Sequence, residues 1–437
     1  MWRNWAGDQH CAPAARVRAT RRQDVVDAVR RAAAEGRTVR AVGAGHSFSD
    51  VALTNGYHVS LEGMDRVLDA DRESGLVRVE AGIAIHALNR RLAELGLALE
   101  NLGDVDRQSV AGAIATATHG TGARLRNLSS QVQALELVAG DGTVVEIDES
   151  DPDALRAARV GLGALGVVTA VTLRCVPAFT LEAVDAPAPV DEVLATLNER
   201  VGANDHFEFY FFPYADRALT RTNNRVDRPP SPRARARAWA DDVLLANHAF
   251  HAFCLAGRLL PRRIPRINRA VTRLIGTTRR VDRSFEVFAS PRLVRFTEME
   301  YAVPRARVVE AVRGVRELIE RERFAVSFPV EVRFVAPDDA FLSTAQGGET
   351  AYVAVHMFRG MDWEPYFRAV EELMDGLEGR PHWGKRHFQT AETLRPRYPE
   401  WDRFQAVRAR LDPEGRFANA YVDRVLGRLP AAVEAAG

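Results

Sequence analysis

The chain of 437 residues exceeds the size of one ordinary hydrophobic core, so two or more domains are expected. Hydrophobic residues make up 46% of it and charged residues 27%, which is typical of a soluble globular protein. The net charge of +1 gives no electrostatic reason to expect binding to nucleic acid or to an anionic membrane. The three cysteines have no metal-ligand spacing and predict neither a metal site nor a disulfide framework. The N-terminus lacks the apolar region of a signal peptide, and a cytoplasmic location is expected.

The first hundred residues alternate between short helices and strands. Residues 21–35 carry apolar side chains at helical spacing, with Thr20 as the expected N-cap and Gly36 as the stop. A second amphipathic helix is expected at 84–95, and strands at 38–42, 57–61, 67–70 and 76–79. This order predicts an α+β domain without a regular βαβ repeat.

A glycine-rich turn, AVGAGHSFSD at 41–50, follows the first of these strands. Gly43 and Gly45 let the backbone approach a ligand closely and adopt positive φ. Successive uncovered N–H groups in such a turn suit phosphate oxygens, and His46 adds a nucleophilic nitrogen beside them. The alternative is a tight turn with a surface histidine, because one glycine-rich turn is a weak signal.

Two later stretches also consist of small residues. Residues 101–122, NLGDVDRQSVAGAIATATHGTG, are interpreted as the wall of a cofactor site, with a closely packed Ala/Gly core helix as the alternative. Between the two stretches, an Asp-Gly turn joins strands at 131–139 and 143–147 into a hairpin, and a helix is expected at 151–158. Residues 161–176, GLGALGVVTAVTLRCV, predict a glycine-rich turn that enters a long strand.

The composition changes after Pro177, which indicates a second domain. A helix is expected at 181–201, an aromatic strand at 207–214, a helical insertion at 242–275, strands at 284–303 and a helix at 308–323. The Pro/Arg-rich run at 225–237 lacks interleaved aromatic residues, so it is interpreted as solvated surface rather than a nucleic-acid site. Residues 243–260 are too short and too polar to span a membrane.

Three segments of this second part carry polar residues in apolar surroundings. In FPVEVRFV (328–335), Glu331 and Arg333 share one face of a strand, either as a salt bridge or as a polar face towards a substrate. In AYVAVHMF (351–358), His356 taken alone is interpreted as a buried core histidine. Lys385, the only lysine in the sequence, follows Trp383-Gly384 and is either a cation held in an aromatic turn or an ordinary surface lysine. A helix at 401–411 and a turn at 412–421 return the chain to the first domain.

Five of these segments together resemble the FAD-linked aldonolactone and alditol oxidases of the vanillyl-alcohol-oxidase superfamily. They are GAGHS (43–47), SVAGAIATATHGTG (109–122), GLGALGVVTAVTL (161–173), FPVEVRF (328–334) and HWGK (382–385). The resemblance implies an α+β fold with two domains. Residues 1–177 would bind FAD, with 411–437 returning to that domain, and residues 178–410 would form a cap with an antiparallel sheet flanked by helices.

The resemblance also implies roles for single residues. His46 would bond covalently to the flavin 8α-methyl group. The pyrophosphate would be held by Val42, Gly43, Ala44, Gly45, His46 and Ser47. The flavin and its tail would be lined by Ser109, Ile114, Ala117, Thr121, Gly122 and Val168. The substrate would be faced by Glu331, Arg333 and Lys385, together with Ser109 and His356.

The activity implied is transfer of hydride from a sugar-derived alcohol to flavin N5, followed by reduction of oxygen to hydrogen peroxide. Lys385 and Arg333 would stabilise the negative charge that develops. Related dehydrogenases carry a larger residue at the position of Gly103, and by analogy this glycine favours oxygen. The expected substrate is an aldono-1,4-lactone. An alditol, a non-oxygen acceptor, a membrane-attached form and a non-catalytic flavoprotein are the alternatives, and a monomer or small homo-oligomer is expected.

Overall fold

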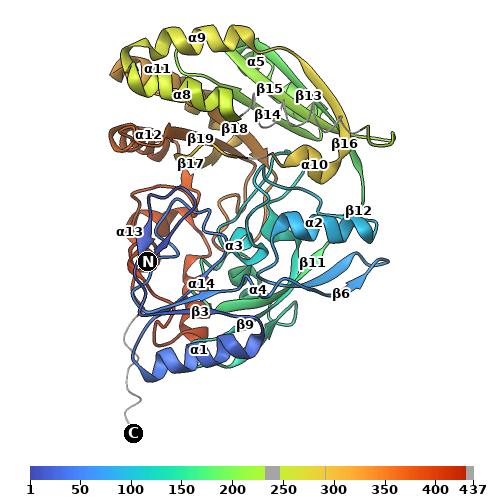
Figure 1. The fold of residues 1–437 in the computed structure, drawn as a ribbon, viewed down its shortest axis with the longest axis vertical. Coiled ribbons are helices and arrows are strands. Elements are labelled where there is room, and N and C mark those ends of the chain that lie inside the picture. The colour runs from blue at the N-terminus through green and yellow to red at the C-terminus, as the bar shows by residue number, and fades with distance from the viewer. Residues whose placement is uncertain (232–246, 291, 430–437) are drawn as a thin grey trace.

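The computed structural model describes residues 1–231, 247–290 and 292–429, and its elements form two parts, one above the other in Figure 1. The lower part contains the N-terminal elements and the C-terminal helices. The upper part is built around one large sheet. The two largest hydrophobic clusters of the described residues correspond to these parts, as expected for a chain of this length.

The lower part contains two main sheets. One is parallel, with strand order β3 (Ala15–Arg18), β5 (Tyr57–Ser60), β4 (Val39–Val42). The other is antiparallel, with order β10 (Val144–Ile147), β9 (Val132–Val138), β11 (Val167–Arg174), β7 (Leu76–Glu80), β6 (Val67–Asp71). Two short pairs are β1 (Trp2–Arg3) with β2 (His10–Cys11), and β8 (Leu97–Ala98) with β12 (Val176–Pro177). The helices are α1 (Arg22–Ala34), α2 (Ile85–Glu94), α3 (Val110–Ala115), α4 (Pro152–Arg159), α13 (Ala391–Leu394), α14 (Trp401–Leu411) and α15 (Ala420–Leu426).

The upper part is an eight-stranded sheet in which every neighbouring pair is antiparallel. Its order is β16 (Thr278–Arg283), β13 (Thr180–Pro189), β15 (Arg217–Val226), β14 (His206–Phe211), β18 (Val330–Val335), β19 (Thr350–Phe358), β17 (Phe296–Pro304), β20 (Arg380–Pro381). Its helices are α5 (Val190–Ala195), α6 (Leu197–Ala203), α8 (Phe250–Leu259), α9 (Ile264–Leu274), α10 (Ser284–Phe288), α11 (Val308–Glu322) and α12 (Glu364–Asp375). The expected antiparallel sheet flanked by helices is confirmed.

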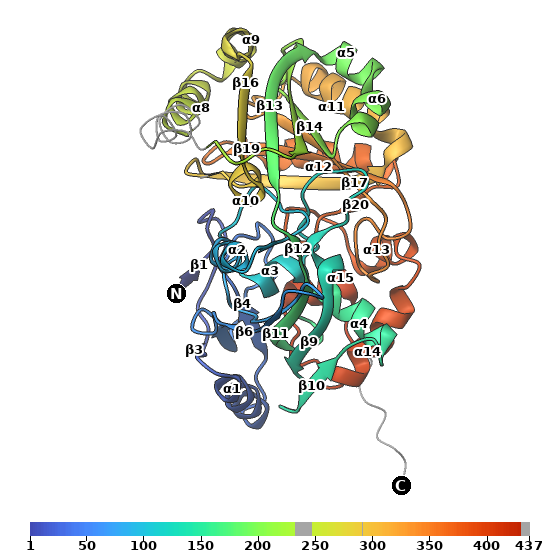
Figure 2. The same ribbon diagram turned by 90° about the vertical axis from the view of Figure 1, so that its right-hand side faces the viewer.

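The C-terminal segment rejoins the lower core earlier than the sequence suggested. Trp383, Trp401, Phe404 and Tyr421 pack in the same core as the N-terminal elements. Figure 2 shows α14 beside α4, where the two helices are in contact. The expected cap boundary at residue 410 therefore differs from the packing, because α14 buries its apolar face against the lower part.

Most expected elements of the lower part are present, and the Asp-Gly hairpin joins β9 to β10. The helix expected at 181–201 is wrong in its first half. Residues 180–189 form β13, because Pro187 and Pro189 cannot continue a helix and the strand pairs with β15 and β16. Thr20 is not the N-cap of α1, since Arg21 takes that position and Asp24 accepts the hydrogen bonds of the Thr20 amide and hydroxyl.

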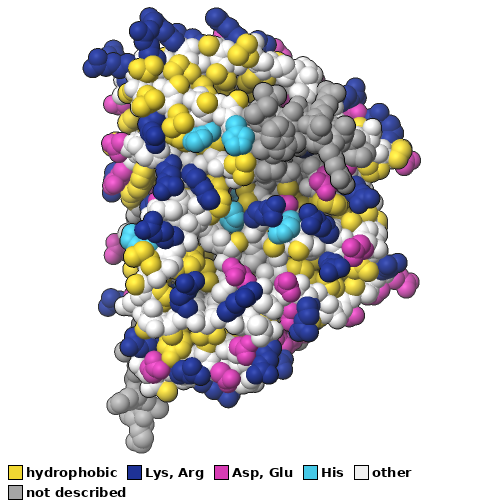
Figure 3. Space-filling view, in the orientation of Figure 1, with side chains coloured by type: hydrophobic (Ala, Val, Ile, Leu, Met, Phe, Trp, Pro, Cys, Tyr) yellow, Lys and Arg dark blue, Asp and Glu magenta, His cyan; other side chains and the backbone are white. Residues whose placement is uncertain are grey.

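The helical insertion forms α8 and α9 at the top of the cap. Residues 232–246, which include part of the Arg-rich run and the start of the insertion, lie outside the described residues. Figure 3 shows apolar and basic side chains side by side on the face over α8 and α9, where Leu259 and Leu274 are exposed. Among the residues that the structure describes, no helix has the length and apolar character needed to cross a membrane.

Candidate functional site

A first cavity lies between the turn after β4, the helix α3 and the glycine-rich turn before β11. It is lined by residues 42–47 of the first turn and by Gly161, Leu162, Gly163, Leu165 and Gly166 of the second. The predicted cofactor residues on this wall are Val42, Gly43, Ala44, Gly45, His46, Ser47, Ser109, Ile114 and Val168. Two glycine-rich turns that are more than a hundred residues apart in the sequence thus face one space.

Two glycines of the first turn are required by close packing. A Cβ on Gly43 would lie 2.1 Å from Oγ of Ser109, and Gly45 has a φ of +69° with Trp2 2.9 Å from the position of its Cβ. The Ser109 hydroxyl accepts the amide N–H of Gly112 at 3.3 Å and caps α3. The turn therefore packs directly on the start of α3, and a side chain at either glycine would displace it.

Three residues predicted to line the flavin do not line this cavity. Thr121 donates its hydroxyl to the Phe207 carbonyl at 2.5 Å and accepts the Phe334 amide at 3.2 Å. Gly122 donates its amide to the Phe334 carbonyl at 2.7 Å. Ala117 is fully buried with a φ of +59°. Thr121 and Gly122 join the lower part to β14 and β18 of the cap instead, whereas the Ala117 amide donates to the Ile114 carbonyl at 3.1 Å.

A second cavity lies between the turn and the cap sheet, and His46 lines both cavities. The predicted residues Glu331, Arg333, His356 and Lys385 line the second cavity, with aromatic walls from Trp5, Phe48, Tyr210, Phe250, Phe296 and Phe328. Ser109 does not line it, because its hydroxyl faces the turn and α3. The sequence prediction that Ser109 faces the substrate therefore differs from its place in the structure.

Lys385 is held by a carboxylate that the sequence analysis did not select. Its Nζ donates to Oε2 of Glu298 at 2.5 Å and lies 5.2 Å from the ring centre of Phe48. Burial opposes the charged form, but the Glu298 carboxylate together with the charges of Glu300 and Asp104 outweighs burial and raises the pKa of Lys385. The other oxygen of Glu298 lies 3.5 Å from Nε2 of His356. One carboxylate therefore orders both a lysine and a histidine on the wall of the second cavity.

Arg333 lies among three carboxylates. It contacts Glu331, donates Nε to Oε2 of Glu208 at 3.0 Å, and has Nη2 3.5 Å from Oδ1 of Asp104. Burial together with the nearby charges of Asp104 and Glu208 raises the pKa of Glu331 to about 7, although Arg333 acts in the opposite direction. Three acids share one guanidinium, so Glu331 is the carboxyl that takes up a proton near neutral pH.

The sequence analysis missed Glu298, Asp104, Glu208 and Arg292. Arg292 is ion-paired to Asp104, so this pair joins the cap to the loop before α3. A signal existed for Glu298, since FTEMEYAV (296–303) places two carboxylates in an apolar strand, and buried carboxylates need partners. No local pattern marks Asp104, whose partners follow more than a hundred residues later.

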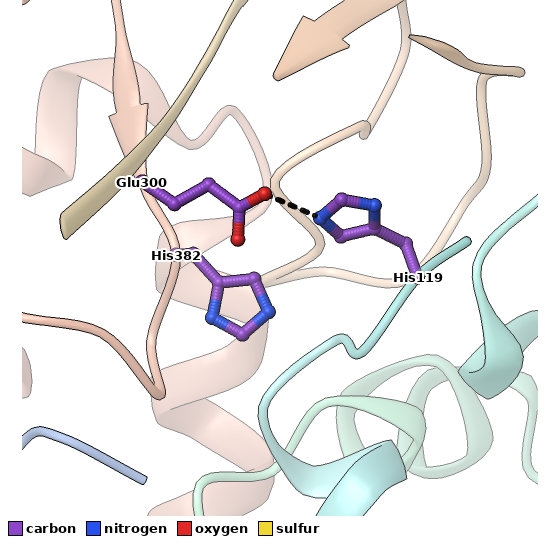
Figure 4. Close-up of side chains that lie close together, drawn as sticks. All are labelled: His119, Glu300 and His382. Atoms are coloured by element: carbon purple, nitrogen blue, oxygen red, sulfur yellow. Dashed lines mark ion pairs between the residues drawn. The ribbon is translucent and has the colours of Figure 1, made fainter. Parts of the chain in front are cut away.

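A third polar group lies behind the second cavity, where Glu300 of β17 meets His119 and His382 (Figure 4). All three are buried, and Oε1 of Glu300 lies 3.3 Å from Nε2 of His119. His119 Nδ1 faces the Gly120 carbonyl at 2.9 Å, which assigns it a proton. His119 and Glu300 therefore lie in direct contact in the buried interior.

This group has ligand spacing for a metal ion, but its hydrogen bonds do not suit one. Nδ1 of His382 accepts the amide N–H of Gly384 at 3.1 Å, so its proton resides on Nε2. Neither ring nitrogen of His382 then offers a free lone pair. The arrangement matches a buried carboxylate–histidine contact next to a neutral His382.

Comparison with known proteins adds the following. Residues 171–425 match the family described as D-arabinono-1,4-lactone oxidase, and residues 13–148 match an FAD binding domain. The chain is 52% identical to L-gulono-1,4-lactone dehydrogenase of Mycobacterium tuberculosis (strain ATCC 25618 / H37Rv), over 98% of this chain and 99% of the relative. It is 34% identical to L-gulonolactone oxidase of Bos taurus, over 97% and 98%. Cholesterol oxidase from B. sterolicum superposes with a TM-score of 0.83 at 18% identity, over 97% of this chain and 96% of that one, which shows the shared fold.

Proposed function

We propose that this chain, which belongs to the D-arabinono-1,4-lactone oxidase family, is an FAD-dependent oxidase of aldono-1,4-lactones. The observation that carries this proposal is the pair of cavities that meet at His46. One has glycine-rich walls, and the other has a lysine and an arginine held by carboxylates. The relatives named for L-gulono-1,4-lactone support the substrate class.

The first cavity fits FAD on its own features. Its wall is backbone at the two glycine-rich turns, where an added Cβ would collide with neighbouring atoms at Gly43 and at Gly166. Uncovered backbone amides suit a diphosphate, and the apolar residues Ile114, Leu137 and Val168 suit an aromatic ring system. When bound, FAD supplies the acceptor for hydride.

The residues of the second cavity would bind and polarise the substrate. Its charged residues balance, with Lys385, Arg333 and Arg292 against Glu298, Glu331 and Asp104. A balanced wall favours a neutral polyhydroxy compound such as a lactone over a free sugar acid, because a carboxylate would meet no unpaired cation. Lys385 and Arg333 would stabilise negative charge on the substrate oxygen, and ionised Glu331 would accept the proton of a hydroxyl.

We further propose that His46 carries the flavin covalently. Burial, with the charges of Arg295, Lys385 and Arg107, lowers the pKa of His46 to about 4, so its imidazole is neutral and nucleophilic at pH 7. The test is acid precipitation of the purified protein. The pellet should stay yellow, and that of His46→Ala should be colourless. A yellow supernatant from the unaltered protein would remove His46 as the attachment point.

Oxygen is the proposed acceptor, and Gly103 supports it by analogy. A Cβ at Gly103 would lie 3.0 Å from the His119 carbonyl oxygen, so a larger residue would shift the loop before α3. The relative named a dehydrogenase favours a second candidate, an enzyme with another acceptor. Stopped-flow mixing of the substrate-reduced protein with oxygen separates the two. An oxidase reoxidises at the rate of turnover and forms one hydrogen peroxide per product, whereas a dehydrogenase reoxidises only with a dye or protein acceptor.

An alditol remains the alternative substrate. Steady-state rates with L-gulono-1,4-lactone, D-arabinono-1,4-lactone, xylitol and sorbitol distinguish the two classes. The proposal expects higher kcat/KM with a lactone, and a preference for xylitol or sorbitol would replace it with the alditol assignment.

A further inference from the structure

We propose that Trp5, presented by the N-terminal hairpin, is a positioning residue that fixes the imidazole of His46 for its bond to the flavin. The inference rests on the covalent attachment proposed above. It concerns a residue 41 positions before the histidine that also lines the second cavity.

The hairpin is built around one buried asparagine. Strands β1 and β2 pair Trp2 with Cys11, and between them the Asn4 side-chain oxygen accepts three backbone amides. These are the N–H groups of Gly7, Asp8 and Gln9, at 2.8, 3.1 and 3.1 Å. Asn4 is 6% exposed, so these bonds are shielded from water and fix the shape of the loop that carries Trp5.

Three hydrogen bonds then join the hairpin to carbonyls on both sides of His46. The Trp5 amide donates to Gly45 at 2.7 Å, Asn4 Nδ2 donates to Ser47 at 3.1 Å, and Gln9 Nε2 donates to Phe48 at 3.1 Å. The backbone before and after the histidine is therefore held by one element. Little rotation of the His46 backbone is possible while these bonds persist.

The Trp5 ring fixes the side chain itself. The indole and imidazole rings stack with centroids 5.5 Å apart and planes 27° from parallel. The Arg295 guanidinium of the cap lies 4.4 Å from the centre of the Trp5 ring and also donates to its carbonyl oxygen. Phe296 meets the indole edge-on at 5.6 Å. Trp5 is thus held by the cap and in turn limits the orientations open to the imidazole.

The orientation of the His46 imidazole matters because one of its nitrogens has to form a bond to the 8α-methyl carbon of the flavin. An imidazole nitrogen replaces one hydrogen of the 8α-methyl group. The net change transfers that hydrogen and the imidazole N–H hydrogen to oxygen, which becomes hydrogen peroxide. The nitrogen must therefore be unprotonated and aimed at the methyl carbon, and misplacement by about 1 Å costs about a hundredfold in rate. Arg295 serves both requirements, because it holds Trp5 and its charge disfavours a proton on His46.

The experiment compares Trp5→Ala, Trp5→Phe and a matched control, Trp363→Ala. Trp363 is another half-buried tryptophan with an arginine over its ring, Arg386 at 4.6 Å, and it lines neither cavity. Each protein, purified from riboflavin-starved cells so that it carries no flavin, is incubated with FAD in air. The fluorescent flavin that stays with the chain on a denaturing gel is followed over time. We expect attachment to slow about tenfold to a hundredfold in Trp5→Ala, to recover partly in Trp5→Phe, and to be unchanged in Trp363→Ala.

A second measurement separates positioning from folding. In a His46→Ala background, Trp5→Ala should leave the Kd for FAD within about twofold, because the cavity wall is otherwise intact. Loss of FAD binding there, or equal slowing in Trp363→Ala, would overturn the positioning role. Attachment at the unaltered rate in Trp5→Ala would overturn it as well. An unaltered protein that carries no covalent flavin would instead overturn the attachment proposal.

Discussion

At the scale of single residues, Lys385 is the most direct test of the second cavity. Lys385→Met should lower kcat about a hundred- to a thousandfold and leave the flavin bound, because the cation faces the substrate cavity. The substitution also leaves Glu298 buried without its partner, so Tm should fall. The double variant Lys385→Met/Glu298→Gln should recover Tm but not kcat. Recovery of kcat in the double variant would show that Lys385 acts only through stability.

Glu331 is predicted to set the pH dependence near neutrality. Its pKa is raised to about 7, mainly by burial, so the carboxyl is neutral below that pH and ionised above it. The ionised form is the one that accepts a substrate proton, and kcat/KM should therefore rise with pH through about 7. In Glu331→Gln, kcat/KM should not rise with pH through about 7. A rise that persists unchanged in the variant would assign the titration to another group.

The sequence predicts some of the site residues and misses others, and the difference has physical reasons. Gly43, Gly45 and His46 form a local pattern, and the first cavity contains them as expected. Glu331 and Arg333 could be paired from the strand period of two, and they are in contact. The ligands of Lys385 and Arg333 come from other strands, so only the folded sheet brings Glu298, Asp104 and Glu208 to them.

At the scale of elements, β17 organises the region between the two parts of the molecule. Its alternation places Glu298 on Lys385 and Glu300 on His119, two residues apart along one strand. His119→Phe should lower the free energy of unfolding by about 3–5 kcal/mol, because it leaves Glu300 buried and unpaired. Adding Glu300→Gln should restore most of this loss. Urea denaturation checks both variants, and an unaltered midpoint for His119→Phe would exclude a stabilising contact between His119 and Glu300.

Helices and strands were predicted correctly where the sequence has a clear periodicity or clear turn residues. The helix α1 and the β9–β10 hairpin have clear periodicity or turn chemistry, and both are present. The first half of the helix expected at 181–201 is wrong because its apolar spacing fits a helix, whereas its prolines and its pairing partners on β15 and β16 decide for a strand. Pairing between strands that are far apart in the sequence cannot be predicted from a short stretch of residues.

At the scale of the whole molecule, the buried histidines predict loss of stability in acid. Burial first, then nearby arginines, lowers the pKa of His58 to about 4, while an unfolded histidine titrates near 6.5. Between these values the unfolded chain binds more protons, so stability falls as pH drops from about 6.5 towards 4. The Tm of His58→Phe should depend less steeply on pH in this window. An identical slope would exclude His58 as a contributor.

Length and composition predict two domains, but they do not predict the residues at which the chain passes from one part to the other. The chain crosses between the parts more often than a simple division at residues 177 and 410 implies. Phe341 and Trp383, which the sequence placed in the cap, both pack in the lower core. Such crossings bring Lys385 and the strand residues Glu331 and Arg333 to the same cavity as His46.

Anaerobic addition of L-gulono-1,4-lactone to the purified protein tests the central claim most directly. The account predicts that the yellow absorbance bleaches within the turnover time and returns, with hydrogen peroxide, when air is admitted. A flavin spectrum unchanged by this lactone, by D-arabinono-1,4-lactone and by the alditols would contradict it.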